Sequence, residues 1–171
     1  QPTLFERLGP RAQACRVVQP SAFVGSGLTL AALRGAEAVP AETLDERVDA
    51  AAGALRRGAE CVYLYWGEID HAGHAAGWTS GEWVAELESF DSAVASLARS
   101  APRGTLIVIT ADHGMVDVGT RIDLADSPRL REGADLVAGE DRAVQVYTRE
   151  PEALAARWRE ELGEAALVLT A

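Results

Sequence analysis

Several residue types are scarce in this sequence, and each scarcity excludes a class of protein. The 171 residues contain two cysteines, Cys15 and Cys61, whose number excludes a disulfide-rich scaffold and whose spacing suits no zinc knuckle. No apolar run approaches the length that crosses a membrane, and no charged-then-apolar leader opens the sequence. These absences predict a soluble protein without a membrane segment, which we expect in the cytoplasm.

Positive charge is also in the minority. The sequence has 16 Lys and Arg against 26 Asp and Glu, and its formal net charge is −10. Such an acidic surface argues against a nucleic-acid surface and against binding to anionic membranes. A solubilising surface is the simple interpretation, but a small phosphorylated substrate fits as well if bound cations reverse the local field. The sequence leaves the oligomeric state open.

Length and patterning predict the fold class. With 48% hydrophobic and 25% charged residues, the composition is that of a soluble globular domain long enough to bury a core. Strand-like and helix-like patterns alternate along the chain, with no internal repeat and no linker. The sequence therefore predicts a single α/β domain over residues 1–171, with a mainly parallel sheet flanked by helices.

Two longer helices are predicted from capping boxes followed by apolar residues at helical spacing. Thr43 with Glu46 opens the first, and Thr79 with Glu82 opens the second. The strands that flank the second helix would form a right-handed βαβ unit with it. The predicted strands lie at residues 14–18, 62–66, 105–110, 143–148 and 167–169, and further helices begin near Leu4, Ser26 and Pro151.

The sequence has only three histidines, and all of them lie in two acid-bearing loops after predicted strands. Asp70, His71 and His74 follow the first strand, and Asp112 and His113 follow the second. Loops that leave the carboxyl ends of parallel strands form the ligand crevice of an open sheet, and carboxylate with imidazole suits zinc, manganese or iron. The spacing favours a metal site, although surface histidines and capping aspartates remain the alternative.

Two motifs in these loops resemble the alkaline phosphatase superfamily, and in particular its type I phosphodiesterase / nucleotide pyrophosphatase branch. The segment EIDHAGHAAGW carries the D-x-x-G-H-x-x-G pattern of that branch, and ITADHGM carries its later A-D-H-G-M pattern. Two motifs in the right order and at the right separation are more specific than either alone. The resemblance covers the whole chain and implies an alkaline-phosphatase-like α/β fold, present here as a partial domain.

The resemblance also implies a set of metal ligands. Asp70 and His74 would bind one divalent ion, and Asp112 and His113 would bind a second, with zinc expected and manganese as the alternative. His71 has no ligand role in the family. The implied activity is the two-metal hydrolysis of phosphodiester or pyrophosphate bonds in small, nucleotide-type substrates.

The sequence departs from the family pattern outside these motifs. The family has a further Asp near the N-terminus, a further His far downstream, and a Thr or Ser nucleophile at a helix start upstream. In this chain the first aspartate is Asp45, within a predicted helix, and the last histidine is His113. We therefore interpret the chain as an internal or C-terminal-half fragment of a longer phosphodiesterase domain, inactive by itself because the nucleophile lies outside it.

Two kinds of alternative remain open at this point. A phosphomonoesterase, a metal-dependent mutase or a sulfatase of the same superfamily would share the metal motifs. A non-catalytic module that binds metal or phosphate would share them as well, and it would lack a nucleophile throughout.

Overall fold

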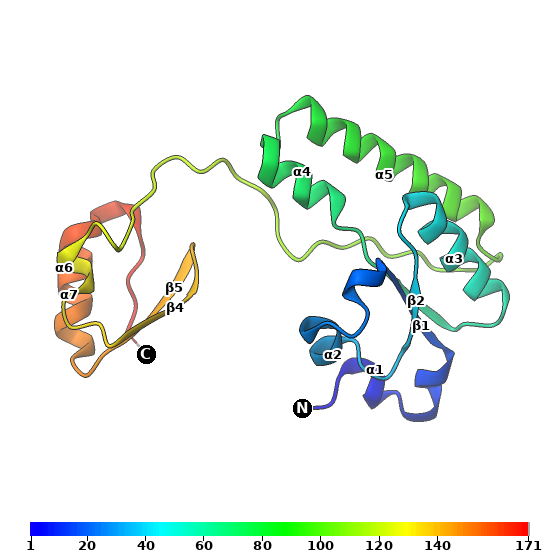
Figure 1. The fold of residues 1–171 in the computed structure, drawn as a ribbon, viewed down its shortest axis with the longest axis horizontal. Coiled ribbons are helices and arrows are strands. Elements are labelled where there is room, and N and C mark those ends of the chain that lie inside the picture. Colours follow the sequence, from blue (N-terminus) through cyan, green and yellow to red (C-terminus); the bar gives the residue numbers. More distant parts are fainter. Residues whose placement is uncertain (171) are drawn as a thin grey trace. The chain divides into compact units, whose positions relative to one another are not determined.

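The computed structural model describes residues 1–170, which fall into two compact units (Figure 1). The N-terminal unit is Gln1–Asp117, and the C-terminal unit begins at Val118. The single domain expected over residues 1–171 stays a prediction. No helix within residues 1–170 has the length and the apolar character needed to cross a bilayer.

A three-stranded parallel sheet in the order β2-β1-β3 forms the centre of the N-terminal unit. Its strands are β1 (Cys15–Gln19), β2 (Glu37–Pro40) and β3 (Cys61–Leu64). The central strand β1 pairs with both neighbours, so that its residue Arg16 lies opposite Glu37 on one side and Val62 on the other. Parallel neighbours require crossover connections, which the helices between the strands provide. The predicted α/β class, with a parallel sheet flanked by helices, is confirmed.

The N-terminal unit also contains five helices. They are α1 (Leu4–Arg7), α2 (Gly27–Ala32), α3 (Leu44–Arg56), α4 (Glu68–Ala76) and α5 (Gly81–Ser100), with 3-10 turns η1 (Gly9–Ala14) and η2 (Ser21–Phe23). Helix α3 packs on the sheet, and α5 packs along α3, as Figure 1 shows. Val18, Ala41 and Ala51 form the buried cluster between α3 and the sheet, and Leu97 of α5 packs against it.

The predicted start of helix α3 is confirmed, and the predicted start of helix α5 is wrong. The capping box of Thr43 and Glu46 is present at α3, with both of its reciprocal hydrogen bonds. Helix α5 begins after Ser80, whose hydroxyl accepts a hydrogen bond from the backbone N–H of Trp83, so the box predicted at Thr79 is wrong by one residue. Serine and threonine are comparable N-caps, and local sequence does not decide between adjacent candidates.

The predicted strand at residues 105–110 is not formed in this structure, and the predicted βαβ unit is therefore absent from the described residues. Residues 105–110 follow α5 without joining either sheet. Leu106, Val108 and Ile109 are 84%, 73% and 60% exposed. A β-branched, apolar run raises strand propensity but supplies no pairing partner, and the ladder hydrogen bonds depend on that partner.

The contrast between this segment and the central strand gives a stability prediction. Val18 is 0% exposed at the centre of the sheet. We expect Val18→Ala to lower the free energy of unfolding in a urea titration by about 2 kcal/mol, because buried methyl groups are lost. Val108→Ala makes the same chemical change at an exposed side chain and should cost less than about 0.5 kcal/mol. Equal losses would show that residues 105–110 are packed as a strand in solution.

The C-terminal unit is a small hairpin with a helical layer. It contains α6 (Pro128–Arg131), the antiparallel strands β4 (Leu136–Glu140) and β5 (Ala143–Tyr147), helix α7 (Pro151–Leu162) and turn η3 (Gly163–Ala165). Leu130, Leu154 and Trp158 form its core, where the indole N–H of Trp158 donates to the carbonyl oxygen of Leu130 at 2.8 Å. The predicted strand near residue 143 and the helix from Pro151 are confirmed, whereas residues 167–169 form no strand.

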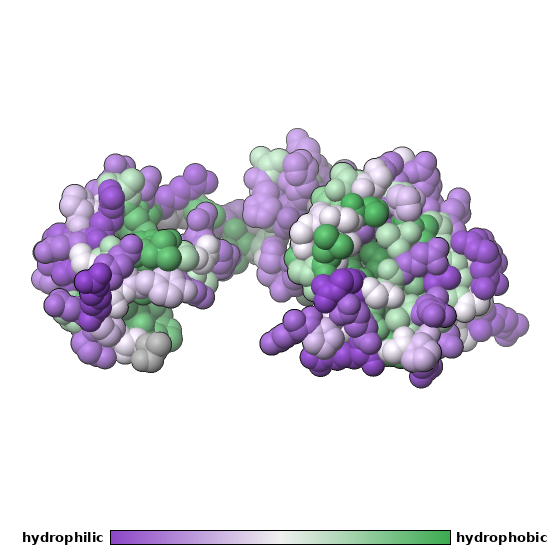
Figure 2. Space-filling model, turned by 60° about the horizontal axis from the view of Figure 1, so that its bottom comes forward, coloured by the Kyte–Doolittle hydropathy of each residue, from purple (hydrophilic) through white to green (hydrophobic). Residues whose placement is uncertain are grey.

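Hydrophilic residues dominate the face drawn in Figure 2, and hydrophobic residues lie between them on both units. The hydrophobic core of each unit is small. In the N-terminal unit, the largest fully buried side chains are Val17, Val18 and Cys15, all from β1.

Candidate metal site

The first candidate pair lies on a helix, which corrects the prediction of a loop. Residues 68–76 form α4, whose first turn carries the acids Glu68 and Asp70, favourable at a helix N-terminus. The helix ends at Gly77, which has a φ of +90°, a value that side-chain-bearing residues rarely adopt. Small residues such as Gly73 suggested a loop, but the alanines around it favour a helix.

Helix α4 places Asp70 and His74 on one face. Their spacing of four residues brings Asp70 Oδ1 to 3.4 Å from His74 Nε2. Two atoms that bind one tetrahedral zinc at about 2.0 to 2.2 Å lie roughly 3.4 Å from each other. Both side chains are exposed, at 51% for Asp70 and 70% for His74. The donor types and their separation therefore fit one divalent ion.

The second candidate pair lies where the chain bends after residues 105–110. His113 Nε2 is 3.8 Å from Asp112 Oδ2, and the backbone N–H of His113 donates to Asp112 Oδ1 at 3.1 Å. The other ring nitrogen, Nδ1, is 2.9 Å from the carbonyl oxygen of Gly114. The side chain of Asp112 is 90% exposed and that of His113 is 57% exposed. Adjacent residues point to opposite faces in a regular strand, so this departure from strand geometry lets the two side chains meet.

A contact between Met115 and Gly73 connects the two motifs. A Cβ atom at Gly73 would collide with the thioether of Met115, and it would also lie 3.2 Å from Cδ1 of Trp83. The missing side chain of Gly73 therefore lets Met115, two residues after His113, pack against the helix that carries Asp70 and His74. The two halves of the candidate site belong to the same N-terminal unit.

Each pair supplies only part of a coordination sphere. Within residues 1–170, no group of three or more His, Cys, Asp or Glu side chains is placed to hold one ion. Closed zinc sites use four protein ligands, and catalytic ones use three with a water. Each pair would thus account for two donors to its ion, and the assignment of Asp70, His74, Asp112 and His113 as ligands stays a prediction.

Comparison with known protein families gives a match. The family described as type I phosphodiesterase / nucleotide pyrophosphatase matches residues 23–169, a range that includes both Asp/His pairs. The chain belongs to the type I phosphodiesterase / nucleotide pyrophosphatase family. Comparisons with curated proteins and with solved structures give no match. The resemblance to the alkaline phosphatase superfamily is confirmed, and the family is one of hydrolases.

In this phosphodiesterase-family chain, the phenol of Tyr65 lies in the electrostatic field of both candidate pairs. Burial raises the pKa of the Tyr65 phenol above its usual value, and the negative charges of Asp70 and Asp112 contribute to the rise. The ring of Tyr65 also packs edge-on against Phe23, with 5.6 Å between the centroids. The negative field that both acids produce near Tyr65 is the kind of field that would attract a cation.

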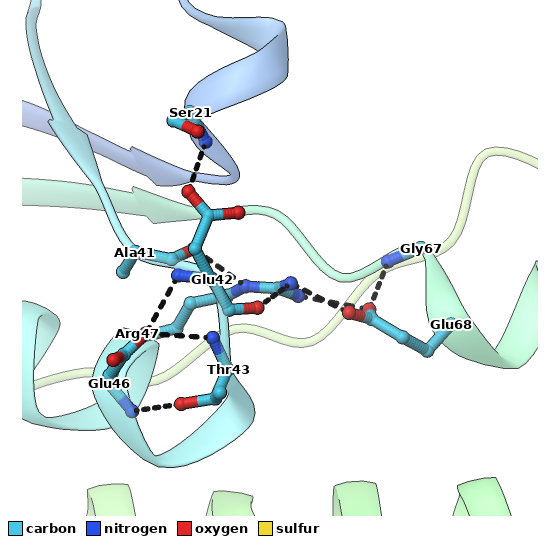
Figure 3. A network of polar contacts seen from close by, with 8 residues as sticks. All are labelled: Ser21, Ala41, Glu42, Thr43, Glu46, Arg47, Gly67 and Glu68. Atoms are coloured by element: carbon cyan, nitrogen blue, oxygen red, sulfur yellow. Dashed lines mark hydrogen bonds and ion pairs between the residues drawn. The ribbon is translucent and has the colours of Figure 1, made fainter.

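Sequence reasoning missed Arg47, a buried residue of α3. Its side chain is 2% exposed and forms an ion pair with Glu68, whose side chain is 40% exposed (Figure 3). Partial burial alone would raise the pKa of the Glu68 carboxyl, but the hydrogen bond and charge of Arg47 lower it below its usual value. A signal for Arg47 was present, because it lies three residues after Leu44 and four before Ala51, on the apolar face of α3.

Proposed function

We propose that this chain is the metal-binding central portion of an enzyme that hydrolyses phosphodiester or pyrophosphate bonds with two divalent metal ions. The observation that carries the proposal is the presence of two Asp/His pairs, with oxygen–nitrogen separations of 3.4 and 3.8 Å, on segments that meet at Met115 and Gly73. Membership in a family of hydrolases supports this class of reaction. Zinc fits the mixed oxygen and nitrogen donors, and manganese is the alternative.

The four proposed ligands divide into two binding pairs. Asp70 and His74 would hold one ion, and Asp112 and His113 would hold the other. A proton on His113 Nδ1 can be donated to the carbonyl oxygen of Gly114 at 2.9 Å, and this tautomer makes Nε2 the metal-binding atom. When bound, such ions polarise phosphoryl oxygens and stabilise the leaving oxygen.

The proposed substrate is small and phosphorylated. With a net charge of −10, the chain would repel a phosphate ester in the absence of bound cations, so the ions would provide the local positive charge. No serine or threonine of this chain is assigned as the nucleophile. We propose that this group and the remaining metal ligands lie outside these residues, in the intact protein.

A chelator experiment on the intact protein tests the proposed function. We expect hydrolysis of bis(p-nitrophenyl) phosphate to fall to the background rate in excess EDTA and to return when zinc is added, because the ions supply the charge stabilisation. Full turnover with metal confirmed absent would contradict the proposal. Faster hydrolysis of p-nitrophenyl phosphate or p-nitrophenyl sulfate than of the diester would instead assign a monoesterase or sulfatase reaction.

A further inference from the structure

Arg47, on α3, binds two other segments at one edge of the sheet. From α3, its Nε donates to the carbonyl oxygen of Ala41 at 3.2 Å, and its Nη2 donates to that of Glu42 at 2.6 Å. Nη1 donates to Glu68 Oε2 at 2.9 Å, and Nη2 lies 2.7 Å from Glu68 Oε1. The guanidinium thus lies between the two carbonyl oxygens and the carboxylate (Figure 3). Only the planar fork of an arginine can bind all of these acceptors together.

The segments that meet at Arg47 all follow the carboxyl ends of the parallel strands. Ala41 and Glu42 follow β2, and Glu68 follows β3. Glu42 continues the network to the end of β1, since its carboxylate accepts the backbone N–H of Ser21 at 2.9 Å (Figure 3). The carboxyl edge of a parallel sheet is where ligands bind in α/β proteins. The network therefore lies at the edge that carries the first candidate pair.

The network reaches the residue that precedes helix α4. The N-cap residue of this helix is Gly67, which has no side chain to cap the helix. Glu68 Oε2 accepts the backbone N–H of Gly67 at 3.0 Å while it binds Arg47. The guanidinium carbon of Arg47 also lies 5.1 Å from the ring centroid of Trp66, in the connection between β3 and α4.

We infer that Arg47 is a positioning residue that fixes the start of α4 and, through that helix, the placement of Asp70 and His74. Both side chains belong to the short helix that Glu68 begins, so a displacement of its first turn moves them together. The consequence for metal binding rests on the proposed function, whereas the placement of α4 does not.

Hydrogen exchange followed by mass spectrometry tests this inference in the metal-free chain. We expect Arg47→Met to accelerate exchange of the peptide that covers α4 about tenfold, and exchange of α5 by less than about twofold. Arg56→Met is the matched control, because exposed Arg56 also lies on α3 and donates to a backbone carbonyl, that of Ser100. This control should leave α4 unchanged. Equal acceleration of both helices in Arg47→Met, or no acceleration of α4, would overturn the inference.

Glu68→Gln decides the matter if Arg47→Met does not fold. This variant retains an acceptor for the Gly67 N–H and loses the ion pair, so we expect the same pattern with about threefold faster exchange of α4. Unchanged exchange of α4 in Glu68→Gln would overturn the inference as well.

Zinc titration of the same variants connects the inference to the site. Arg47→Met and Glu68→Gln should bind zinc about tenfold more weakly than Arg56→Met, because the two donors on α4 are no longer held in place. Equal affinities would overturn the positioning role. Absence of zinc binding by the unmodified intact protein would contradict the proposed function, and the exchange pattern of α4 would still decide the role of Arg47.

Discussion

Replacing Asp70 or His74 with alanine should reduce kcat/KM for a phosphodiester by more than about a hundredfold. Loss of a residue that hydrogen-bonds a metal ligand costs up to about a hundredfold, and loss of the ligand itself should cost more. Each substitution removes one of the two donors that α4 presents, at a separation of 3.4 Å. Both side chains are more than half exposed, so the free energy of unfolding should change by less than about 0.5 kcal/mol. The measurements are steady-state kinetics of the intact protein and urea titration of each variant.

His71→Ala is the matched control for this prediction. His71 is an exposed histidine on the same helix, one residue after Asp70, and side chains one residue apart on a helix do not face each other. Its loss should leave kcat/KM within about twofold of the unmodified protein. Equal losses in His71→Ala and His74→Ala would show that α4 matters as a whole and that the i, i+4 pair is not the metal site.

Asp112→Ala should cause a similarly large loss of activity, although Asp112 contributes little to the stability of the fold. Its side chain is 90% exposed, and it contacts the backbone N–H and the ring of the adjacent His113. A solvent-exposed loop aspartate without a function would change neither activity nor stability measurably. We expect kcat/KM to fall by more than about a hundredfold while the free energy of unfolding changes by less than about 0.5 kcal/mol.

Asp117→Ala provides the corresponding control. It removes the same charge from an exposed aspartate five residues further along, in a stretch that likewise has no regular secondary structure. An effect of net charge on substrate attraction would appear in both variants and would weaken at high ionic strength. A metal-ligand effect should appear in Asp112→Ala alone. Unchanged activity in Asp112→Ala would remove Asp112 from the proposed second pair.

The parts of the fold that the sequence predicted are those with local causes. The start of α3 follows from the reciprocal capping of Thr43 and Glu46, two groups separated by three residues. Strand β1 follows from a short strand-like segment, residues 14–18, which Pro20 ends. The α/β class follows from the alternation of such segments, and it needs no knowledge of which strands pair.

The parts that the sequence missed depend on contacts between distant residues. Within α4, residue 73 has to be a glycine because Met115 packs where a Cβ atom would lie. Residues 105–110 have strand propensity, yet they pair with no strand among the described residues. Arg47 became recognisable only when the structure placed Glu68 beside it, 21 residues further along the chain. Local patterns cannot specify such pairings, because they depend on the packing of whole elements.

Metal content of the intact protein tests the central claim most directly. After zinc saturation and dialysis, elemental analysis should find about two zinc ions per chain, as a two-metal site requires. Asp70→Ala and Asp112→Ala should each retain about one ion, because each removes a donor from one pair only, and His71→Ala and Asp117→Ala should retain both. A full zinc content in Asp70→Ala and Asp112→Ala, or none in the unmodified protein, would contradict the proposed metal site.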